Sequence, residues 1–344
     1  MYQWPDLDVV ALSRLGKLTN AERIGLLHTH SSFDGALASL GAIDIDLRDT
    51  ATTIIEQASV EGVQTIVYGA TNYPERLLLL EQPPLVVYVL GTMPSKHTPS
   101  VAVVGTRSCT VSYGKPVTDL LVKQWTEAGC VIVSGLAKGI DTLAHEACLR
   151  SGGSTIAVIA SGIGRISPIA ARHLAARIAT NGGAVLCEYP FHVAALPPYF
   201  PARNRLIATL SDAVVIVESK ATGGALITAS FAHSQNIPVW SVPGPINSSR
   251  SHGTNALIAS GMARPLTSGA ELLSTLPMHV NPSPLTLAMR EPDQRAVALG
   301  ADPVTVDQAA CAWKCSLPEA MILLFELEIE GYVTAEPGGR YRAC

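Results

Sequence analysis

Apolar residues change their spacing twice along the 344-residue chain, and these changes divide it into three stretches. Up to about residue 60 they recur every three or four positions, as with Leu12, Leu15, Ile24 and Leu27. This spacing predicts amphipathic helices, and short polar breaks separate them as in a small helical bundle. We therefore expect residues 1–60 to form a helical domain.

From Thr65 onward the apolar residues form short continuous runs rich in Val and Ile, which predict strands. TIVYG and LVVYVLG come first, and six further runs alternate with helical stretches such as 116–128 and 141–150. Runs that are apolar at every position predict strands buried on both faces, as in a parallel, doubly wound sheet. We therefore expect residues 61–280 to form an extended Rossmann-like α/β domain. The six predicted strands are 101–104, 131–133, 156–160, 184–186, 213–217 and 239–242.

A Pro- and Ser-rich break at residues 281–284 ends this domain, and the residues after it predict three helices and a short hairpin. That outline is a winged helix, which we place at 285–344 and which normally reads DNA. The third helix, 318–330, carries four glutamates and neither Lys nor Arg, and carboxylates repel phosphates. We therefore expect this domain to contact protein or to regulate. The glutamates are Glu319, Glu326, Glu328 and Glu330.

The net charge of −4 is unevenly distributed. Residues 101–280 carry 13 Lys and Arg against 8 Asp and Glu, whereas residues 1–100 carry 6 against 11 and residues 281–344 carry 5 against 9. A basic centre between acidic ends favours a polyanion site in the middle domain, although ordinary scatter of surface charge would give a similar count.

Targeting and redox signals are sparse. The start of the chain does not resemble a signal peptide, and no apolar run approaches the roughly 18 residues that a membrane span needs. We therefore expect a soluble, cytoplasmic protein without membrane contact. Seven cysteines without regular spacing predict reduced thiols rather than disulfides, and Cys311 and Cys315 fit a helix face better than a zinc site.

Four segments that follow predicted strands gather hydrogen-bond donors, cations and glycines. Ligands of doubly wound sheets bind beyond the carboxyl ends of the strands. Glycine at a single such turn usually serves only backbone geometry, but four segments at one sheet edge indicate a site. Guanidinium groups, an aromatic ring and a glycine loop at a helix start suit phosphate binding and base stacking. The segments are Gly105-Thr106-Arg107-Ser108, residues 134–141 with Lys138, residues 200–205, and Thr222-Gly223-Gly224.

The sequence lacks the motifs of several common enzyme classes. It contains no G-x-G-x-x-G turn, no G-x-x-x-x-G-K-[ST] loop and no G-x-S-x-G elbow, and its nine histidines do not pair into a metal motif. Glu188 and Glu218 stand at strand ends, where a catalytic carboxylate could lie, but structural or phosphate-binding roles are favoured. We expect no enzyme activity, no catalytic residue, no cofactor and no bound metal.

Seven segments follow one another in the middle domain: VAVVGTRSCTVSYG, VSGLAKGIDTLAH, CEYP, FPARNRLIATLSDAVVIVE, TGGALITA, VPGPI and HGTNALIASG. In this order they resemble the DNA processing protein A family, also called DprA or Smf. The helical start resembles that family's sterile-alpha-motif-like (SAM-like) module, and the tail resembles its winged helix. The resemblance implies a homodimeric protein that binds and protects incoming single-stranded DNA and loads the RecA recombinase onto it during natural transformation.

The resemblance also implies site residues. Arg107 and Lys138 would bind phosphate, and Phe200 would stack a base or form a pocket wall. Arg203 and Arg205 would face the same side in an extended segment at loop ends and diverge in a helix, and Arg205 would alternatively bind a loop carboxylate. Residues 160–178 and 233–237 depart from the family pattern, which leaves the local loop shape open. The full implied set is Arg107, Ser108, Lys138, Phe200, Arg203, Asn204, Arg205, Gly223, Gly224 and Thr228.

Two alternatives remain open. A nucleotide N-glycosidase similar to the cytokinin-activating phosphoribohydrolases would use the same sheet type, with a Gly-Gly loop and paired glutamates. Here, however, residues 225–230 after Gly223-Gly224 hold no carboxylate. A signalling scaffold that does not bind DNA would instead bury the Arg107 loop in salt bridges. The site, rather than the fold, decides among these functions.

Overall fold

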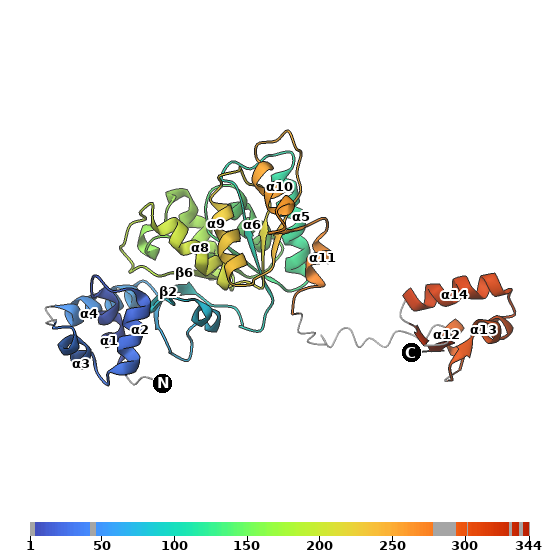
Figure 1. Cartoon of the computed structure of the whole chain (residues 1–344), viewed down its shortest axis with the longest axis horizontal. Coiled ribbons are helices and arrows are strands. Elements are labelled where there is room, and N and C mark those ends of the chain that lie inside the picture. The colour runs from blue at the N-terminus through green and yellow to red at the C-terminus, as the bar shows by residue number, and fades with distance from the viewer. Residues whose placement is uncertain are drawn as a thin grey trace. The chain divides into compact units, whose positions relative to one another are not determined.

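A computed structural model describes residues 4–41, 46–277, 294–300, 302–329, 332–336 and 340–343. The chain forms two compact units, Met1–His279 and Val280–Cys344 (Figure 1). The break expected at 281–284 lies outside the described residues. The two units are each built around their own apolar clusters.

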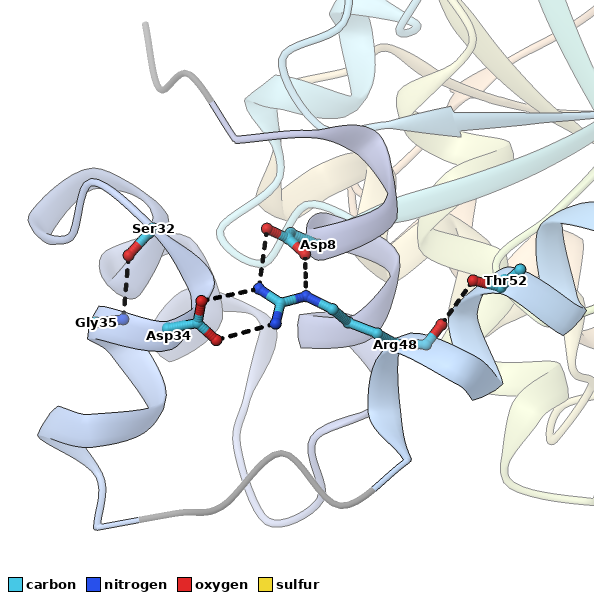
Figure 2. A network of polar contacts seen from close by, with 6 residues as sticks. All are labelled: Asp8, Ser32, Asp34, Gly35, Arg48 and Thr52. Carbon is cyan, nitrogen blue, oxygen red and sulfur yellow. Dashed lines mark hydrogen bonds and ion pairs between the residues drawn. The ribbon is translucent and has the colours of Figure 1, made fainter.

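The first unit begins with four helices, α1 (Asp6–Arg14), α2 (Asn20–Thr29), α3 (Phe33–Ser39) and α4 (Leu47–Val60). Thr19 starts α2 with a reciprocal capping box to Glu22. Figure 2 shows Arg48 of α4 reaching both neighbouring helices: its Nε lies 2.7 Å from Asp8 Oδ1 and its Nη1 lies 3.0 Å from Asp34 Oδ1. One guanidinium group therefore connects α1, α3 and α4.

A nine-stranded sheet in the order β1-β2-β6-β5-β4-β3-β7-β8-β9 forms the centre of this unit. The strands from β6 to β9 pair in parallel, whereas β1 with β2 and β2 with β6 pair antiparallel. Their bounds confirm the six predicted strands to within two residues. They are β1 (Val63–Val67), β2 (Val86–Gly91), β3 (Ser100–Val104), β4 (Val131–Ser134), β5 (Thr155–Val158), β6 (Ala184–Cys187), β7 (Ala213–Ile216), β8 (Val239–Ser241) and β9 (Arg264–Pro265).

Helices cover both faces of the sheet, which confirms the doubly wound class. Alternate residues of each strand enter different clusters: Val103 and Val215 pack with one set of helices, and Val104 and Ile216 pack with the other. The first set is α5 (Gly114–Glu127), α6 (Ile140–Arg150) and α11 (Gly269–Leu273); the second is α8 (Tyr199–Thr209), α9 (Ala225–Ser234) and α10 (His252–Ala259).

The four N-terminal helices share a core with the sheet near β1 and β2. Their apolar residues cluster with Val63, Val86 and Tyr88, and with α7 (Arg172–Thr180). Short 3₁₀ helices complete the unit at η1 (Glu75–Leu79), η2 (Ile163–Arg165) and η3 (Ile169–Ala171). A cleft remains beside this shared core, between α1 and α2 on one side and the sheet on the other. The domain boundary at residue 60 stays a prediction.

The second unit has the elements expected of a winged helix. A three-stranded antiparallel sheet in the order β10-β12-β11 accompanies three helices, and Leu324, Leu327 and Val333 are in its core. The longest helix, α14, also exposes apolar Met321, Ile322 and Phe325. The elements are α12 (Gln294–Val297), β10 (Val304–Thr305), α13 (Val306–Trp313), α14 (Leu317–Ile329), β11 (Val333–Glu336) and β12 (Arg340–Ala343).

Candidate nucleic-acid interface

A pocket of about 340 Å³ opens at the carboxyl ends of the central parallel strands. The strand order reverses here, because β4 lies on one side of β3 and β7 lies on the other. Ligands of open α/β sheets bind at such a reversal. The lining comes from the turn after β3, the loop after β4, the first half of α8, and residues 219–228 around the start of α9.

Gly139 lets the first two of these loops touch. Its φ is +92°, and a Cβ there would lie 2.3 Å from the Thr106 carbonyl oxygen. Only glycine combines that backbone angle with so close an approach. The Ile140 amide then donates to the same carbonyl at 3.3 Å. The turn that carries Arg107 is therefore held against the loop that carries Lys138.

Asp141 accepts hydrogen bonds from the backbone of both the turn after β3 and the loop after β4. Its side chain is buried and accepts from the Gly135 amide at 3.2 Å. Burial raises the pKa of Asp141 to about 6, opposed by the Arg203 charge and by hydrogen bonds from the backbone amides of Gly135, Gly105 and Ala137. Asp141 is not among the predicted site residues, because an acidic residue in the first turn of a helix is also an ordinary helix-start signal.

The expectation that Arg203 sits at a loop end is wrong. Residues 199–209 form α8, and Arg203 is only 5% exposed. Its Nη1 donates to the Gly135 carbonyl at 2.8 Å and to the Val158 carbonyl, so it connects the ends of β4 and β5. Burial lowers the pKa of Arg203 to about 10. A Cβ on Gly135 would lie 2.6 Å from the guanidinium group, which explains that glycine.

Arg205 diverges from Arg203, as the helical alternative predicted. It forms an ion pair with Glu188 and donates to the Gln82 carbonyl at 3.1 Å, and it does not line the pocket. Arg205 therefore binds a carboxylate, as the second alternative predicted. Asn204, between them, does line the pocket and donates to the Gly224 carbonyl at 3.4 Å.

Arg107 and Phe200 lie together at the pocket. The Arg107 guanidinium carbon is 5.5 Å from the centre of the Phe200 ring, within the range of a cation–π contact. Arg107 is exposed, and within the described part of the chain it forms no ion pair. Its loop is therefore not buried in salt bridges, contrary to what the scaffold alternative requires.

The other predicted cation, Lys138, is exposed beside the pocket but is not part of its lining, and the same holds for Ser108. Arg250 Nε donates to the Ser108 carbonyl and fixes that end of the turn. Lys220, which does line the pocket, was missed. Its position just after β7 was the available signal, because every other candidate loop also follows a strand of this sheet.

Gly223 and Gly224, in the loop between β7 and α9, differ in their surroundings. A Cβ on Gly223 would lie 2.1 Å from Ser219 Oγ, whereas nothing lies within 4 Å of a Cβ on Gly224. The fold therefore requires the first glycine but leaves space beside the second. Thr228, one turn into α9, is buried and lines the pocket below them. At the start of α9, the Leu226 amide donates to the Gly223 carbonyl at 3.0 Å and the Ile227 amide donates to the Gly224 carbonyl at 3.2 Å.

The candidate catalytic carboxylates are engaged in structural contacts. Glu218 is buried and accepts from the Thr110 amide at 2.8 Å and from Thr110 Oγ1 at 2.7 Å, which holds the end of the loop after β3. Asp141 is the one carboxylate among the residues that line the pocket. Over the described ranges, no cluster of three or more His, Cys, Asp or Glu could hold a metal ion. No helix in those ranges is both long and apolar enough to span a bilayer.

Fold and site together define a doubly wound α/β protein with a basic, glycine-lined pocket at the reversal of its strand order. The chain belongs to the DNA recombination-mediator protein A family, whose model matches residues 64–277. A second family model, the DprA winged helix domain, matches residues 281–339.

Curated relatives and solved structures agree with this assignment. The chain is 36% identical over 281 residues to protein Smf of Escherichia coli, covering 78% of this chain and 75% of that protein. It is 41% identical over 202 residues to DNA processing protein DprA of Streptococcus pneumoniae, covering 59% of this chain and 70% of that protein. The X-ray structure of that streptococcal DprA superposes with a TM-score of 0.67 at 31% identity, covering 81% of this chain and all of that one.

A structure of DNA processing protein A from Helicobacter pylori, described for its single-stranded DNA binding mode, has a TM-score of 0.56. It is 31% identical and covers 62% of this chain and 94% of that one.

Proposed function

We propose that this protein binds single-stranded DNA in the pocket at the carboxyl ends of β3, β4 and β7. The observation that carries the proposal is the Arg107–Phe200 pair beside the open space at Gly224. An exposed guanidinium group suits a phosphate, and an aromatic ring suits an unpaired base. The open space at the Cβ position of Gly224 admits a sugar-phosphate backbone. The Helicobacter pylori structure, described for binding single-stranded DNA, supports the same ligand class.

The residues divide into two roles in this proposal. Arg107, Lys220 and Asn204 bind the strand directly, with Lys138 and Ser108 available along its path. Phe200 stacks a base, and Gly223, Gly224 and Thr228 form the floor over which the backbone passes. Arg203 and Arg205 position the loops instead of binding DNA, because their guanidinium groups are already occupied by protein acceptors.

We propose further that the protein protects incoming single strands and loads RecA onto them in natural transformation, as a cytoplasmic homodimer without catalytic activity. The relatives named for DNA processing support this place in DNA metabolism. Three domains, a SAM-like 1–60, 61–280 and a winged helix 285–344, would divide these tasks. The exposed apolar residues of α14, flanked by Glu319, Glu326 and Glu328, favour protein contact over DNA for the last domain.

Single strands should bind at least about tenfold more tightly than duplex of the same sequence and length. Stacking on Phe200 requires an unpaired base, and one stacked base contributes about 1–3 kcal/mol. Fluorescence anisotropy at matched salt measures both affinities. The variant Phe200→Leu, which keeps an apolar side chain, should bring the two affinities closer together. Equal affinity of the unmodified protein for both forms would contradict the proposal.

Deleting residues 285–344 should change single-strand affinity by less than about twofold, or raise it slightly. The deleted residues carry a net charge of −4 and so repel DNA weakly. A gel shift with the shortened and full chains at several salt concentrations tests this. A loss of tenfold or more would mean that the tail binds DNA.

A further inference from the structure

A second pocket, of about 290 Å³, lies on the opposite side of α8 from the DNA pocket. Ala202 and Arg205 of α8 line it, whereas Arg203, Asn204 and Ile207 line the first. Its other walls are the end of α1, the start of α2, the beginning of β2 and the residues after β6. It is thus the cleft between the N-terminal helices and the sheet.

The charge of this cleft is positive and largely uncompensated. Arg205 is paired with Glu188, the one carboxylate of the lining. Arg14 is exposed and forms no ion pair with any residue that the structure describes. Within the described ranges, the acceptors that Arg23 binds are neutral: Asn20 Oδ1 at 3.0 Å and the Leu15 carbonyl at 2.7 Å. Two guanidinium groups therefore face one cavity, and neither forms an ion pair with a carboxylate that the structure describes.

The two arginines are close enough to affect each other. Burial is the larger cause that lowers the pKa of Arg23, and the positive charge of Arg14 lowers it further. Glu22 is the only acid that acts in the opposite direction, and it is engaged in the capping box with Thr19. Like charges held together in this way are stabilised by an anion between them.

Two buried donors in the lining also lack acceptors. The Tyr88 hydroxyl, on a side chain only 1% exposed, and the Arg23 Nε have no hydrogen-bond partner among the described residues. Buried polar atoms are almost always bonded, and an unsatisfied one costs about 1–3 kcal/mol. Both atoms are covered by neighbouring side chains, so a ligand rich in acceptor atoms would satisfy them after a small shift of these side chains. Water would supply acceptors too, but it would leave the charges of Arg14 and Arg23 unbalanced.

The remaining walls indicate what carries the anion. Pro84, Leu85 and Pro190 are apolar, and the Tyr189 ring is stacked on Tyr199 with 4.1 Å between ring centres. The volume exceeds that of an inorganic phosphate, so space remains for an organic group. Guanidinium forks match phosphate oxygens, and aromatic and apolar walls suit a sugar and base.

We propose that this cleft binds the phosphate of a nucleotide between Arg14, Arg23 and the Tyr88 hydroxyl. Such a phosphate belongs either to a free mononucleotide or to a nucleotide of a DNA strand that passes around α8. The site is separate from the DNA pocket. Binding of a free mononucleotide does not depend on the function proposed for that pocket, whereas binding of a strand nucleotide rests on it.

Isothermal titration of the full chain with deoxyadenosine 5′-monophosphate and with inorganic phosphate, at low salt, tests the site. Arg14→Gln and Tyr88→Phe should each weaken nucleotide binding about tenfold, because each removes one donor to phosphate. Tyr88→Phe should not lower the melting temperature without ligand, since it removes only an unsatisfied hydroxyl. The matched control is Arg177→Gln, which removes an exposed arginine of α7 outside both pockets.

A second titration with a short oligothymidylate separates the two sources of phosphate. If Arg14→Gln weakens mononucleotide binding alone, the ligand is a free nucleotide; if it also flattens the salt dependence of oligothymidylate binding, the ligand is the strand. The variant Arg107→Ala should affect oligothymidylate binding and leave mononucleotide binding in the cleft unchanged, which distinguishes this site from the DNA pocket. The proposal is overturned if the wild-type protein binds neither deoxyadenosine 5′-monophosphate nor oligothymidylate in the cleft. It is also overturned if Arg14→Gln and Tyr88→Phe bind these ligands as tightly as the control Arg177→Gln does.

Discussion

Arg203→Ala is expected to lower the free energy of unfolding by about 3–5 kcal/mol, because it removes one partner of a buried charged network. The substitution leaves the Gly135 and Val158 carbonyls without their donor. It also leaves the buried Asp141 carboxyl without the nearby positive charge. Since domains are stable by only about 5–15 kcal/mol, urea unfolding followed by circular dichroism should detect the loss easily.

A double-mutant cycle tests whether the loss of stability comes from the interaction between Arg203 and Asp141. Asp141→Asn should cost less in the Arg203→Ala background than alone, because the two side chains interact through their charges. The control Arg107→Ala removes an exposed arginine and should change stability by less than about 0.5 kcal/mol. A stable, normally unfolding Arg203→Ala protein would show that Arg203 is not part of the framework of the site.

Arg107→Ala should weaken single-strand binding by about tenfold or more and leave the melting temperature unchanged. Each phosphate that the variant no longer neutralises should reduce the slope of log affinity against log salt by about 0.7. Removal of the guanidinium group also takes away the cation that lies over the Phe200 ring. Fluorescence anisotropy of labelled oligothymidylate across a salt series measures affinity and slope together.

A matched control and a contradicting result can both be specified for the Arg107→Ala experiment. Arg177→Ala makes the same change of charge on exposed α7 and should leave both affinity and slope nearly unchanged. Lys220→Ala should have an effect of the same kind as Arg107→Ala, since both side chains line the pocket. If Arg107→Ala is folded and binds with wild-type affinity and slope, the DNA pocket lies elsewhere.

The strands and the edge of the sheet that holds the site could be predicted from the sequence, whereas the direction of single side chains could not. Val- and Ile-rich runs mark buried strands whatever their direction, so the antiparallel pairing of β2 with β6 carried no signal. Proline is common both in turns and in the first turn of a helix, and Pro201 lies in the first turn of α8.

Because residues 199–209 form a helix and not an extended segment, Arg203 is buried. In a helix, Arg203 and Arg205 face different directions, and only the packing of α8 on the sheet determines which of them is buried. Lys220 was missed for a related reason. Its position just after β7 makes it a candidate, but only the folded structure shows that it lines the same pocket as Arg107.

The strand order of the nine-stranded sheet also determines when the pocket can form during synthesis. Val101 of β3 pairs with Ala213 of β7, 112 residues later in the chain, and the two strands carry opposite walls of the pocket. At about 5–20 residues per second, a ribosome synthesises β7 roughly 6–22 s after β3. Until then β3 has an unpaired edge and apolar side chains on both faces. Nascent chains should therefore engage chaperones through β3 and become competent for ligand only after β7 has docked.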